Sequence, residues 1–288
     1  MMKAFEYWFG PYPFYEDGYK LVEAPHLGME HQSNIAYGNG YTNGYLGRDL
    51  SNTGVGLKWD FIIVHESGHE WFGNSITAID VADNWIHEGF TDYSETLFTE
   101  YYFGKEDANK YIIGLQDHIA NDKPIIGKYG VHEEGSGDMY YKGANLLHTI
   151  RQIIDNDSLF RTMLLGLNKT FYHQCVTTKQ VEDFISKKSG KSFDKIFDQY
   201  LRTTNVPELF CEFSYGSLTY HWRNVVEGFS MPVKVQIDGN KSIWLNAETT
   251  PKTMEVEGKE QHHIEQDKNF YYRLIDGSPR YPKDESLP

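Results

Sequence analysis

The spacing of apolar residues divides the chain into an irregular start, a helical middle and a strand-rich end. Over residues 1–57, short apolar stretches alternate with glycine, tyrosine and asparagine, and turn dipeptides such as Asn39-Gly40 interrupt them. This pattern predicts short strands and loops, typical of the edge of a sheet. Before them, Phe5 and Phe9 stand four residues apart and indicate a helical turn.

The middle of the chain has helical spacing. A buried helix is predicted from Trp59 to Gly73, because an apolar run of four residues and a later aromatic pair continue one apolar face. We expect Asn74 to cap its end. A second helix is predicted from Asn84 to Gly104. Five further segments have helical spacing: 107–120, 138–155, 157–168, 178–189 and 192–202.

Alternation with a period of two replaces helical spacing from about residue 206. Apolar and polar residues alternate in CEFSYGSLTYHW, PVKVQIDG, SIWLNAE and TMEVEG, with glycine and asparagine at the breaks. This pattern predicts a small antiparallel β module over residues 206–280. Residues 281–288 are polar and proline-containing, which is typical of a loose tail.

Composition narrows the possible classes of protein. The 288 residues are 40% hydrophobic and include 21 tyrosines and 17 phenylalanines, enough for one large or two ordinary domains. The net charge of −14 argues against a nucleic-acid partner, since no basic stripe is present to neutralise phosphates. No apolar run approaches the ~18 residues of a membrane span. The two cysteines have no CxxC spacing, which disfavours a thiolate metal site.

The stretch FIIVHESGHEWFGNS, residues 61–75, places two histidines and two acids directly after an apolar run. His65 and His69 are four residues apart, so on a helix both imidazoles lie on one face, within reach of a single ion. Glu66 points about 100° around the same helix, close to that ion without having to bind it. In the HExxH motif two imidazoles hold zinc and the glutamate transfers protons. Composition alone would produce the motif about 0.04 times in such a chain, so chance is a poor explanation.

A third metal ligand is required, since catalytic zinc usually binds three protein ligands and leaves one position open. Glu88, in NWIHEGF, follows His69 after eighteen intervening residues. A helix, a loop and a second helix packed on the first would return this carboxylate to the metal. We therefore expect His65, His69 and Glu88 to hold one Zn²⁺ ion.

HESGHEWFGNSIT followed by NWIHEGFTDYSE resembles the signature of the zinc aminopeptidases of the aminopeptidase N and leukotriene A4 hydrolase group, which are gluzincin metallopeptidases. The resemblance covers roughly residues 5–205. It implies an α+β protein with a mainly helical, thermolysin-like catalytic domain over residues 1–205 and a small sheet at its N-terminal side. A small antiparallel β-sandwich domain is then expected over 206–280. The resemblance further implies that Glu66 is the general base that activates the attacking water.

A glutamate on a sheet edge is the second point of resemblance. LGMEHQ, residues 27–32, is similar to the GxMEN segment with which the family recognises the free amino terminus of a substrate. Glu30 is therefore implied to bind the substrate amine. Leu27 replaces the first glycine of the segment and His31 replaces its asparagine.

A later helix carries the third point of resemblance. DMYYKGANLL is similar to the family's YxKG segment, which implies that Tyr140 stabilises the oxyanion and that Tyr141 occupies the x position. Glu95 lies seven residues after Glu88, on the same helical face. The resemblance implies that Glu95 hydrogen-bonds a ligand histidine and so fixes its tautomer.

The resemblance implies an enzyme that releases N-terminal amino acids from peptides with a free amino terminus. A zinc endopeptidase of thermolysin type is one alternative, which Glu30 disfavours. A zinc-bearing peptide-binding module with little turnover is another. Family members usually carry a β domain before the catalytic one, so we expect this chain to be joined to such a domain in a longer protein. The remaining histidines lack paired ligand spacing and are expected to be ordinary surface or core residues.

Overall fold

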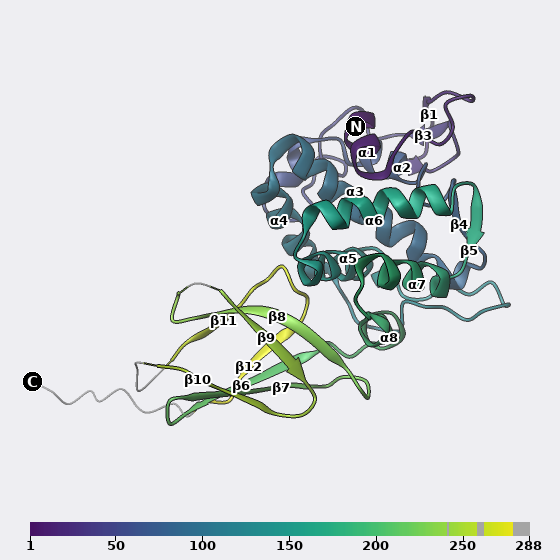
Figure 1. Cartoon of the computed structure of the whole chain (residues 1–288). Helices are drawn as coiled ribbons and strands as arrows, with labels where there is room; N and C mark the ends of the chain where they lie inside the picture. Colours follow the sequence, from purple (N-terminus) through teal and green to yellow (C-terminus); the bar gives the residue numbers. More distant parts are fainter. Residues whose placement is uncertain (241, 258–261, 279–288) are drawn as a thin grey trace, which may run out of the picture. The chain divides into compact units, whose positions relative to one another are not determined.

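The computed structural model describes residues 1–240, 242–257 and 262–278, and these form two compact units (Figure 1). The first unit holds residues 1–204 together with Asn269–Tyr271. The second unit holds the described residues of Asn205–Lys268 and of the chain from Tyr272 to residue 278. The tail expected over residues 281–288 lies outside the described residues, as do the last two residues of the expected β module.

The first unit is mainly helical. Its described residues include the helices α1 (Met2–Phe9), α2 (Phe61–Gly68), α3 (Trp85–Phe103), α4 (Lys105–Gly114), α5 (Tyr141–Ile154), α6 (Asp157–Thr170), α7 (Thr178–Ser189) and α8 (Asp194–Arg202). Helix α3 lies at the centre, in contact with α1, α2, α4 and α5. Because neighbours surround it, α3 is buried nearly all round from Trp85 to Thr99.

Helix α2 is shorter than the sequence predicts. It ends at Gly68, with His69 as its C-terminal cap, and does not reach Gly73. Beyond the cap, the backbone N–H groups of residues 74–76 donate to carbonyls five residues earlier, so the turns are wider than those of an α-helix. These wide turns keep Trp71 buried, which is why the apolar pattern continued past the end of the helix.

A small sheet lies beside α2, as the first residues of the chain predict. It consists of β1 (Leu21–Glu23), β2 (Gly28–Met29) and β3 (Ile35–Tyr37), in the order β1-β3-β2. Strand β1 is parallel to β3, and β2 is antiparallel to it. Strand β2 is therefore an edge strand, and it contacts α2. A separate parallel pair joins β4 (Ile76–Ala78) to β5 (Gln174–Val176).

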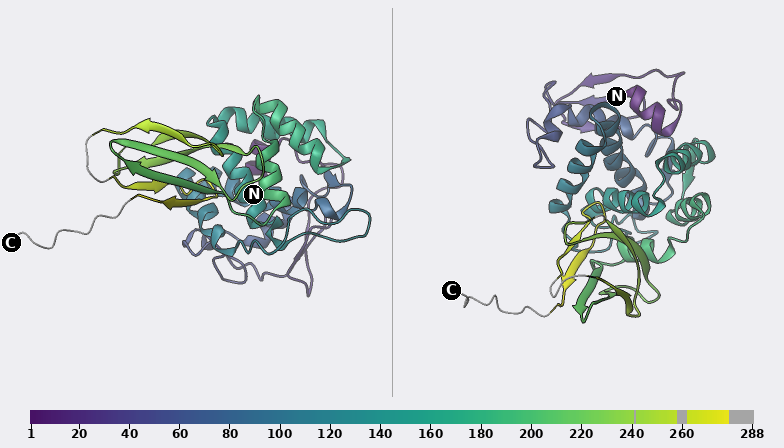
Figure 2. Two further views of the ribbon diagram at one scale, coloured as in Figure 1. Left: turned by 90° about the horizontal axis from the view of Figure 1, so that it is seen from below. Right: turned by 60° about the vertical axis from the view of Figure 1, so that its left-hand side comes forward.

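The second unit is built of strands that run alongside one another in Figure 2. They are β6 (Glu208–Ser214), β7 (Ser217–Arg223), β8 (Ser230–Ile237), β9 (Ile243–Glu248), β10 (Lys252–Glu255), β11 (Ile264–Gln266) and β12 (Arg273–Asp276). One sheet has the order β10-β7-β6-β12 and the other β11-β8-β9. The buried Trp222 of β7 donates from Nε1 to the carbonyl of Met231 in β8, so side chains of the two sheets meet.

One strand pair in the second unit differs from the antiparallel arrangement that the alternation predicts. Strand β12 is parallel to β6, whereas the other described pairs of this unit are antiparallel. The chain passes from β11 in one sheet to β12 in the other, and a change of sheet frees the direction of the incoming strand. Alternation of side chains reports burial and carries no information about strand direction.

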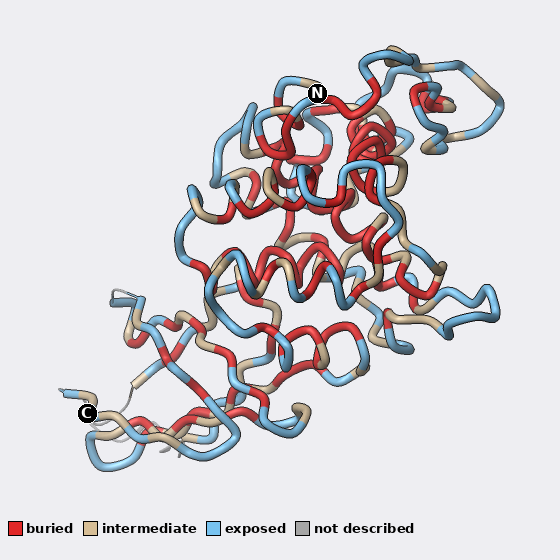
Figure 3. The backbone as a smooth tube through the Cα atoms, turned by 45° about the vertical axis from the view of Figure 1, so that its right-hand side comes forward, coloured by how far each residue is buried: buried red, intermediate tan, exposed pale blue. Residues whose placement is uncertain are grey.

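Burial follows these elements. In Figure 3 long buried stretches run through the helical unit, whereas buried and exposed residues alternate along the strands of the second unit. Within the part of the chain that the structure describes, we find no helix that is both long and apolar enough to cross a membrane. Cys175 is exposed and Cys211 is buried, and both are free thiols.

Candidate metal centre and active site

Helices α2 and α3 bring the three expected metal ligands together. His65 lies in the last turn of α2, His69 caps it, and Glu88 lies in the first turn of α3. The Nε2 atoms of the two histidines are 3.3 Å apart. Glu88 Oε2 lies 3.7 Å from His65 Nε2 and 3.3 Å from His69 Nε2. All three residues are buried, so the donor atoms face one another in a site shielded from water.

This geometry suits a divalent cation. Glu88 Oε2 is buried and accepts no hydrogen bond from any described residue, although burying a carboxylate without a partner is costly. Burial opposes a charge on His65, but Glu88 and Glu95 outweigh it and raise the pKa of His65 well above its ordinary value. The surroundings therefore favour positive charge between these side chains. Two imidazoles and one carboxylate are a donor set that zinc accepts.

The second nitrogen of each histidine already has a partner. His65 Nδ1 lies 2.7 Å from Glu95 Oε1, the contact expected for Glu95, and Tyr111 donates to the other oxygen of Glu95 at 2.6 Å. His69 Nδ1 lies 3.0 Å from the carbonyl oxygen of Phe72. A carboxylate and a carbonyl can only accept, so in the neutral form of each ring the proton sits on Nδ1 and the Nε2 lone pair faces the site.

Glu66 belongs to α2, and its carboxylate lies against the edge strand β2. It is 7% exposed, and burial raises the pKa of its carboxyl group, although the neighbouring histidines oppose this shift. A Cβ atom added at Gly28 would lie 2.4 Å from Glu66 Oε1 and 2.8 Å from Ile62 Cγ2. A glycine is thus required where β2 passes over the helix, because any side chain would displace the glutamate.

Glu30 follows β2 directly and approaches the same place. One carboxylate oxygen of Glu30, one of Glu66 and a ring nitrogen of His69 all lie within 4.8 Å of one another. Two hydrogen bonds hold the turn that carries Glu30. Asn74 Nδ2 donates to the Glu30 carbonyl at 2.9 Å, and the Ser33 N–H donates to the buried Glu70 at 2.7 Å.

The sequence predicts that Asn74 caps helix α2, and this prediction is wrong. Asn74 lies six residues beyond the end of α2, and its side chain fixes the backbone of Glu30. Glycine and asparagine after an apolar run are typical of a helix end, but the wide turns beyond Gly68 carry this asparagine to the sheet. Contacts between segments forty residues apart leave no local signal.

Tyr140 reaches the centre from the start of α5. Its ring is stacked on that of His65 at 6.1 Å between centroids. Burial and the negative charge of Glu88 raise the pKa of the Tyr140 phenol, so its hydroxyl keeps the proton and can donate. The position depends on a close helix crossing, in which Gly143 of α5 lies against Gly89 of α3.

A cavity of about 580 Å³ opens beside these residues. Its wall includes His65, Glu66 and Tyr140, together with the segment from His26 to Gly28, which leads into β2. The remaining lining residues are Tyr45, Leu50, Phe61, Ile62, Asp92 and Tyr141. A largely apolar hollow with a few convergent polar groups is the usual form of a small-ligand site.

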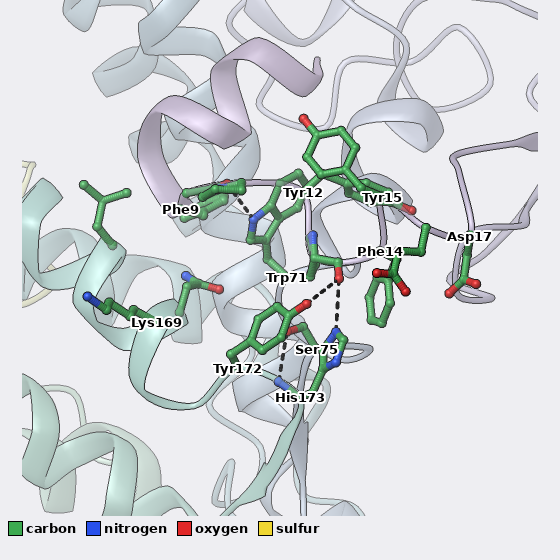
Figure 4. A pocket seen from close by; sticks show the side chains of 16 residues that line it. Phe9, Tyr12, Phe14, Tyr15, Asp17, Trp71, Ser75, Lys169, Tyr172 and His173 are labelled. Carbon is green, nitrogen blue, oxygen red and sulfur yellow. Dashed lines mark hydrogen bonds between the residues drawn. The ribbon is translucent and has the colours of Figure 1, made fainter.

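A larger cavity, of about 920 Å³, lies elsewhere in the helical unit (Figure 4). It is lined by the segment from Phe9 to Asp17 and by residues of α6 and just after it, where Tyr172 and His173 both donate to the Pro13 carbonyl. None of the residues expected to be catalytic or to bind metal lines it. The larger cavity is therefore not the one beside the expected active-site residues. The smaller cavity is the candidate site, because His65, Glu66 and Tyr140 line it.

Sequence reasoning missed several residues around the centre. Asp92 is buried on α3 and lines the smaller cavity, yet no motif singled it out. His26, taken as an ordinary histidine, lines the mouth of the same cavity. His87 accepts the Ala78 N–H at 2.7 Å, and burial lowers its pKa to about 4, so it is a neutral acceptor. Asp92 lies four residues after Glu88, one helical turn away, and this spacing could have indicated that Asp92 lies near the centre.

The profile of the peptidase family M1 domain matches residues 2–200. The chain belongs to peptidase family M1. The matched range includes α1 to α7, most of α8 and the small sheet beside α2, and so contains every residue of the M1 centre described above.

Curated relatives and solved structures resemble the M1 chain. Endoplasmic reticulum aminopeptidase 1 of Mus musculus is 25% identical over 248 residues, covering 82% of this chain and 24% of the relative. Probable aminopeptidase 1 of Saccharolobus solfataricus is 21% identical, covering 80% and 32%. The chain thus spans about a quarter to a third of these relatives.

A solved structure shares the fold of the M1 chain. It is an M1 zinc metallopeptidase mutant from Deinococcus radiodurans bound to a Tyr-Ser-Ala substrate, with a TM-score of 0.55 and 23% identity. The alignment covers 70% of this chain and 43% of that one. The similarity supports the α+β architecture of an M1 peptidase.

Proposed function

We propose that the helical unit is the catalytic region of a zinc-dependent aminopeptidase, which releases N-terminal amino acids from peptides. The observation that carries the proposal is the convergence of His65, His69 and Glu88 on one point, with Glu66 and Glu30 directly beside it. The three donors would hold an ion, and the two further acids would act on a peptide.

His65, His69 and Glu88 would hold the zinc ion. When bound, zinc supplies Lewis acidity to the scissile carbonyl and to a water molecule near neutral pH. Glu95 orients the His65 ring and the Phe72 carbonyl orients the His69 ring, so that both Nε2 lone pairs face the ion.

Glu66 would act as the general base and then as the general acid. It takes the proton of the attacking water and passes it to the leaving amine. Burial raises the pKa of Glu66, which brings the carboxyl group closer to the pH at which it must both accept and return a proton. Gly28 leaves the space that this carboxylate occupies.

Tyr140 would donate its hydroxyl proton in a hydrogen bond to the oxyanion that develops on the scissile carbonyl. Its raised pKa keeps the group a donor at neutral pH. Donors of this kind contribute about 10²–10³ in kcat at comparable sites.

Glu30 would pair with the α-ammonium of the substrate. Because the carboxylate is within 4.8 Å of Glu66 and His69, an amine bound there places the first peptide bond at the metal. An acylated amino terminus cannot satisfy this carboxylate, and the penalty makes the enzyme an exopeptidase. A thermolysin-type endopeptidase would have no use for Glu30 in this position.

The proposal is tested with the purified, zinc-loaded chain and an alanyl amide of a fluorogenic amine. The measurement is the rate at which the free amine is released. We expect turnover that a chelator abolishes, that zinc restores and that is absent for the N-acetylated substrate. Cleavage of the N-acetylated substrate at a similar rate would favour an endopeptidase. Zinc bound without turnover of either substrate would instead indicate a peptide-binding module.

A further inference from the structure

Asp92 is an acid that the proposed mechanism leaves without a task. It lies on α3, one turn beyond Glu88, and lines the smaller cavity. The side chain is 1% exposed, and its Oδ2 atom has no hydrogen-bond partner among the described residues. A buried carboxylate without a partner is costly and is seldom kept without a ligand or a counter-charge.

Orientation of the metal ligands does not explain Asp92. One oxygen of Asp92 lies within 4.8 Å of a ring nitrogen of His65 and of an oxygen of Glu95. However, Glu95 already takes His65 Nδ1 at 2.7 Å and is itself held by Tyr111. A second acid beside Glu95 adds repulsion and no bond, and burial together with Glu95 raises the pKa of Asp92 well above its ordinary value. A positive group from outside the protein is what would stabilise the Asp92 carboxylate.

With its amino terminus held at Glu30, a peptide would extend its leaving part into the cavity. This step rests on the proposed function, in which Glu30 holds the amino terminus. The cavity is lined by the chain before Glu30, from His26 to Gly28. A peptide that extends from Glu30 past Gly28 toward His26 runs antiparallel to the edge strand β2, as added strands commonly do. Its second residue then enters the cavity.

We propose that Asp92 selects peptides whose second residue is basic, by pairing with the charged end of that side chain inside the cavity. The walls suit such a side chain, since Phe61, Ile62 and Tyr141 offer apolar and aromatic surface to a long methylene stem. Among the described residues, no lysine or arginine lines the cavity to compete for Asp92. The cationic group supplies a partner for the Asp92 carboxyl group, which lines the cavity.

Two tripeptides that differ only in charge test this proposal. The zinc-loaded chain is given Ala-Lys-Ala and Ala-norleucine-Ala, which share a four-carbon stem, and released alanine is measured. We expect kcat/KM to be about 10- to 100-fold higher for the lysine peptide, as for a hydrogen bond to a charged group. In Asp92→Asn, which keeps the shape and removes the charge, the ratio falls to near one.

Asp183→Asn is the matched control, because Asp183 is exposed on α7 and its loss changes the net charge equally. This variant should keep the wild-type ratio. Equal rates for the two peptides in the wild type, or an unchanged ratio in Asp92→Asn, overturn the inference alone. Cleavage of neither peptide by the zinc-loaded wild type overturns the proposed function. Should Asp92→Asn fail to fold, the wild-type ratio decides.

Discussion

Gly89 and Gly143 lie backbone against backbone where α3 and α5 cross. A Cβ atom added at Gly143 would lie 3.0 Å from Gly89 Cα, and one added at Gly89 would lie 3.0 Å from the Met139 carbonyl oxygen. Gly89 directly follows Glu88, and Gly143 follows Tyr140 by less than one helical turn, so each glycine is close to a residue of the centre. The crossing therefore sets the separation between the metal site and the tyrosine.

Gly143→Ala should destabilise the chain and reduce turnover. The added methyl group meets backbone that cannot rotate away, and overpacking of this kind costs about 1–3 kcal/mol. The free energy of unfolding in urea and kcat on an alanyl-amide report the two effects. Gly137→Ala is the control, because a Cβ there meets no atom within 4 Å. Equal stability of the two variants would show that the crossing tolerates a side chain.

Glu66→Gln should keep zinc and lose turnover. The amide fills the same space beside Gly28 but cannot accept the proton of water, so kcat should fall by about 10²–10⁴. Elemental analysis gives the zinc content, and an aminoacyl-amide assay gives the rate. Full activity in a zinc-replete variant would remove Glu66 from the mechanism.

Tyr140→Phe should lower kcat by about 10²–10³ and change KM little, since the hydroxyl acts on charge that develops in the transition state. Tyr141→Phe is the natural comparison, because the neighbouring tyrosine also lines the cavity. We expect its effect on kcat to be much smaller. Similar losses in both variants would argue against a special role for Tyr140.

Asn74→Ala should weaken binding of the substrate amine. It removes the hydrogen bond to the Glu30 carbonyl, and a loss of about 1 kcal/mol in positioning corresponds to a several-fold rise in KM. A double-mutant cycle with Glu30→Ala separates positioning from general destabilisation. In the Glu30→Ala background the further effect of Asn74→Ala should nearly vanish. An undiminished effect there would assign Asn74 a purely structural role.

Lys142 should make stability depend on pH above neutrality. It is 1% exposed and donates to the Thr203 carbonyl at 3.1 Å. Burial lowers its pKa to about 8 against an ordinary 10.5, although Asp138 opposes the shift. Between these two values the unfolded chain binds more protons than the folded one, so the free energy of unfolding rises with pH.

Lys142→Met removes this contribution and keeps an unbranched chain. Relative to the variant, the wild type should gain stability between about pH 8 and about pH 10, as measured by urea unfolding at each pH. Parallel pH profiles for the two proteins would contradict the assignment.

Local sequence was sufficient for most helices, because their ends carry their own signals. Thr177 begins α7 with a capping box to Gln180, and the predicted range 178–189 matches the helix. Gly104, directly after α3, has a φ of 93°, which ends that helix where expected. The convergence of His65, His69 and Glu88 was equally predictable, since HExxH and Glu88 depend on spacing within two adjacent helices.

Contacts between distant segments could not be predicted. The direction of β12 depends on which sheet it joins, and Asn74 depends on a strand more than forty residues earlier. Asp92 lies in a helix that is buried nearly all round, so no amphipathic pattern distinguishes a residue facing a cavity from one facing the core. These positions required the tertiary structure.

The hydrogen bonds at Nδ1 of His65 and His69 also bear on which ions the centre admits. With both rings held in place, the centre offers two nitrogens and a single carboxylate. Calcium and magnesium prefer six or more oxygen donors and find too few here. Glu95 and the Phe72 carbonyl, which fix the orientation of the two rings, thus contribute to discrimination against such hard cations.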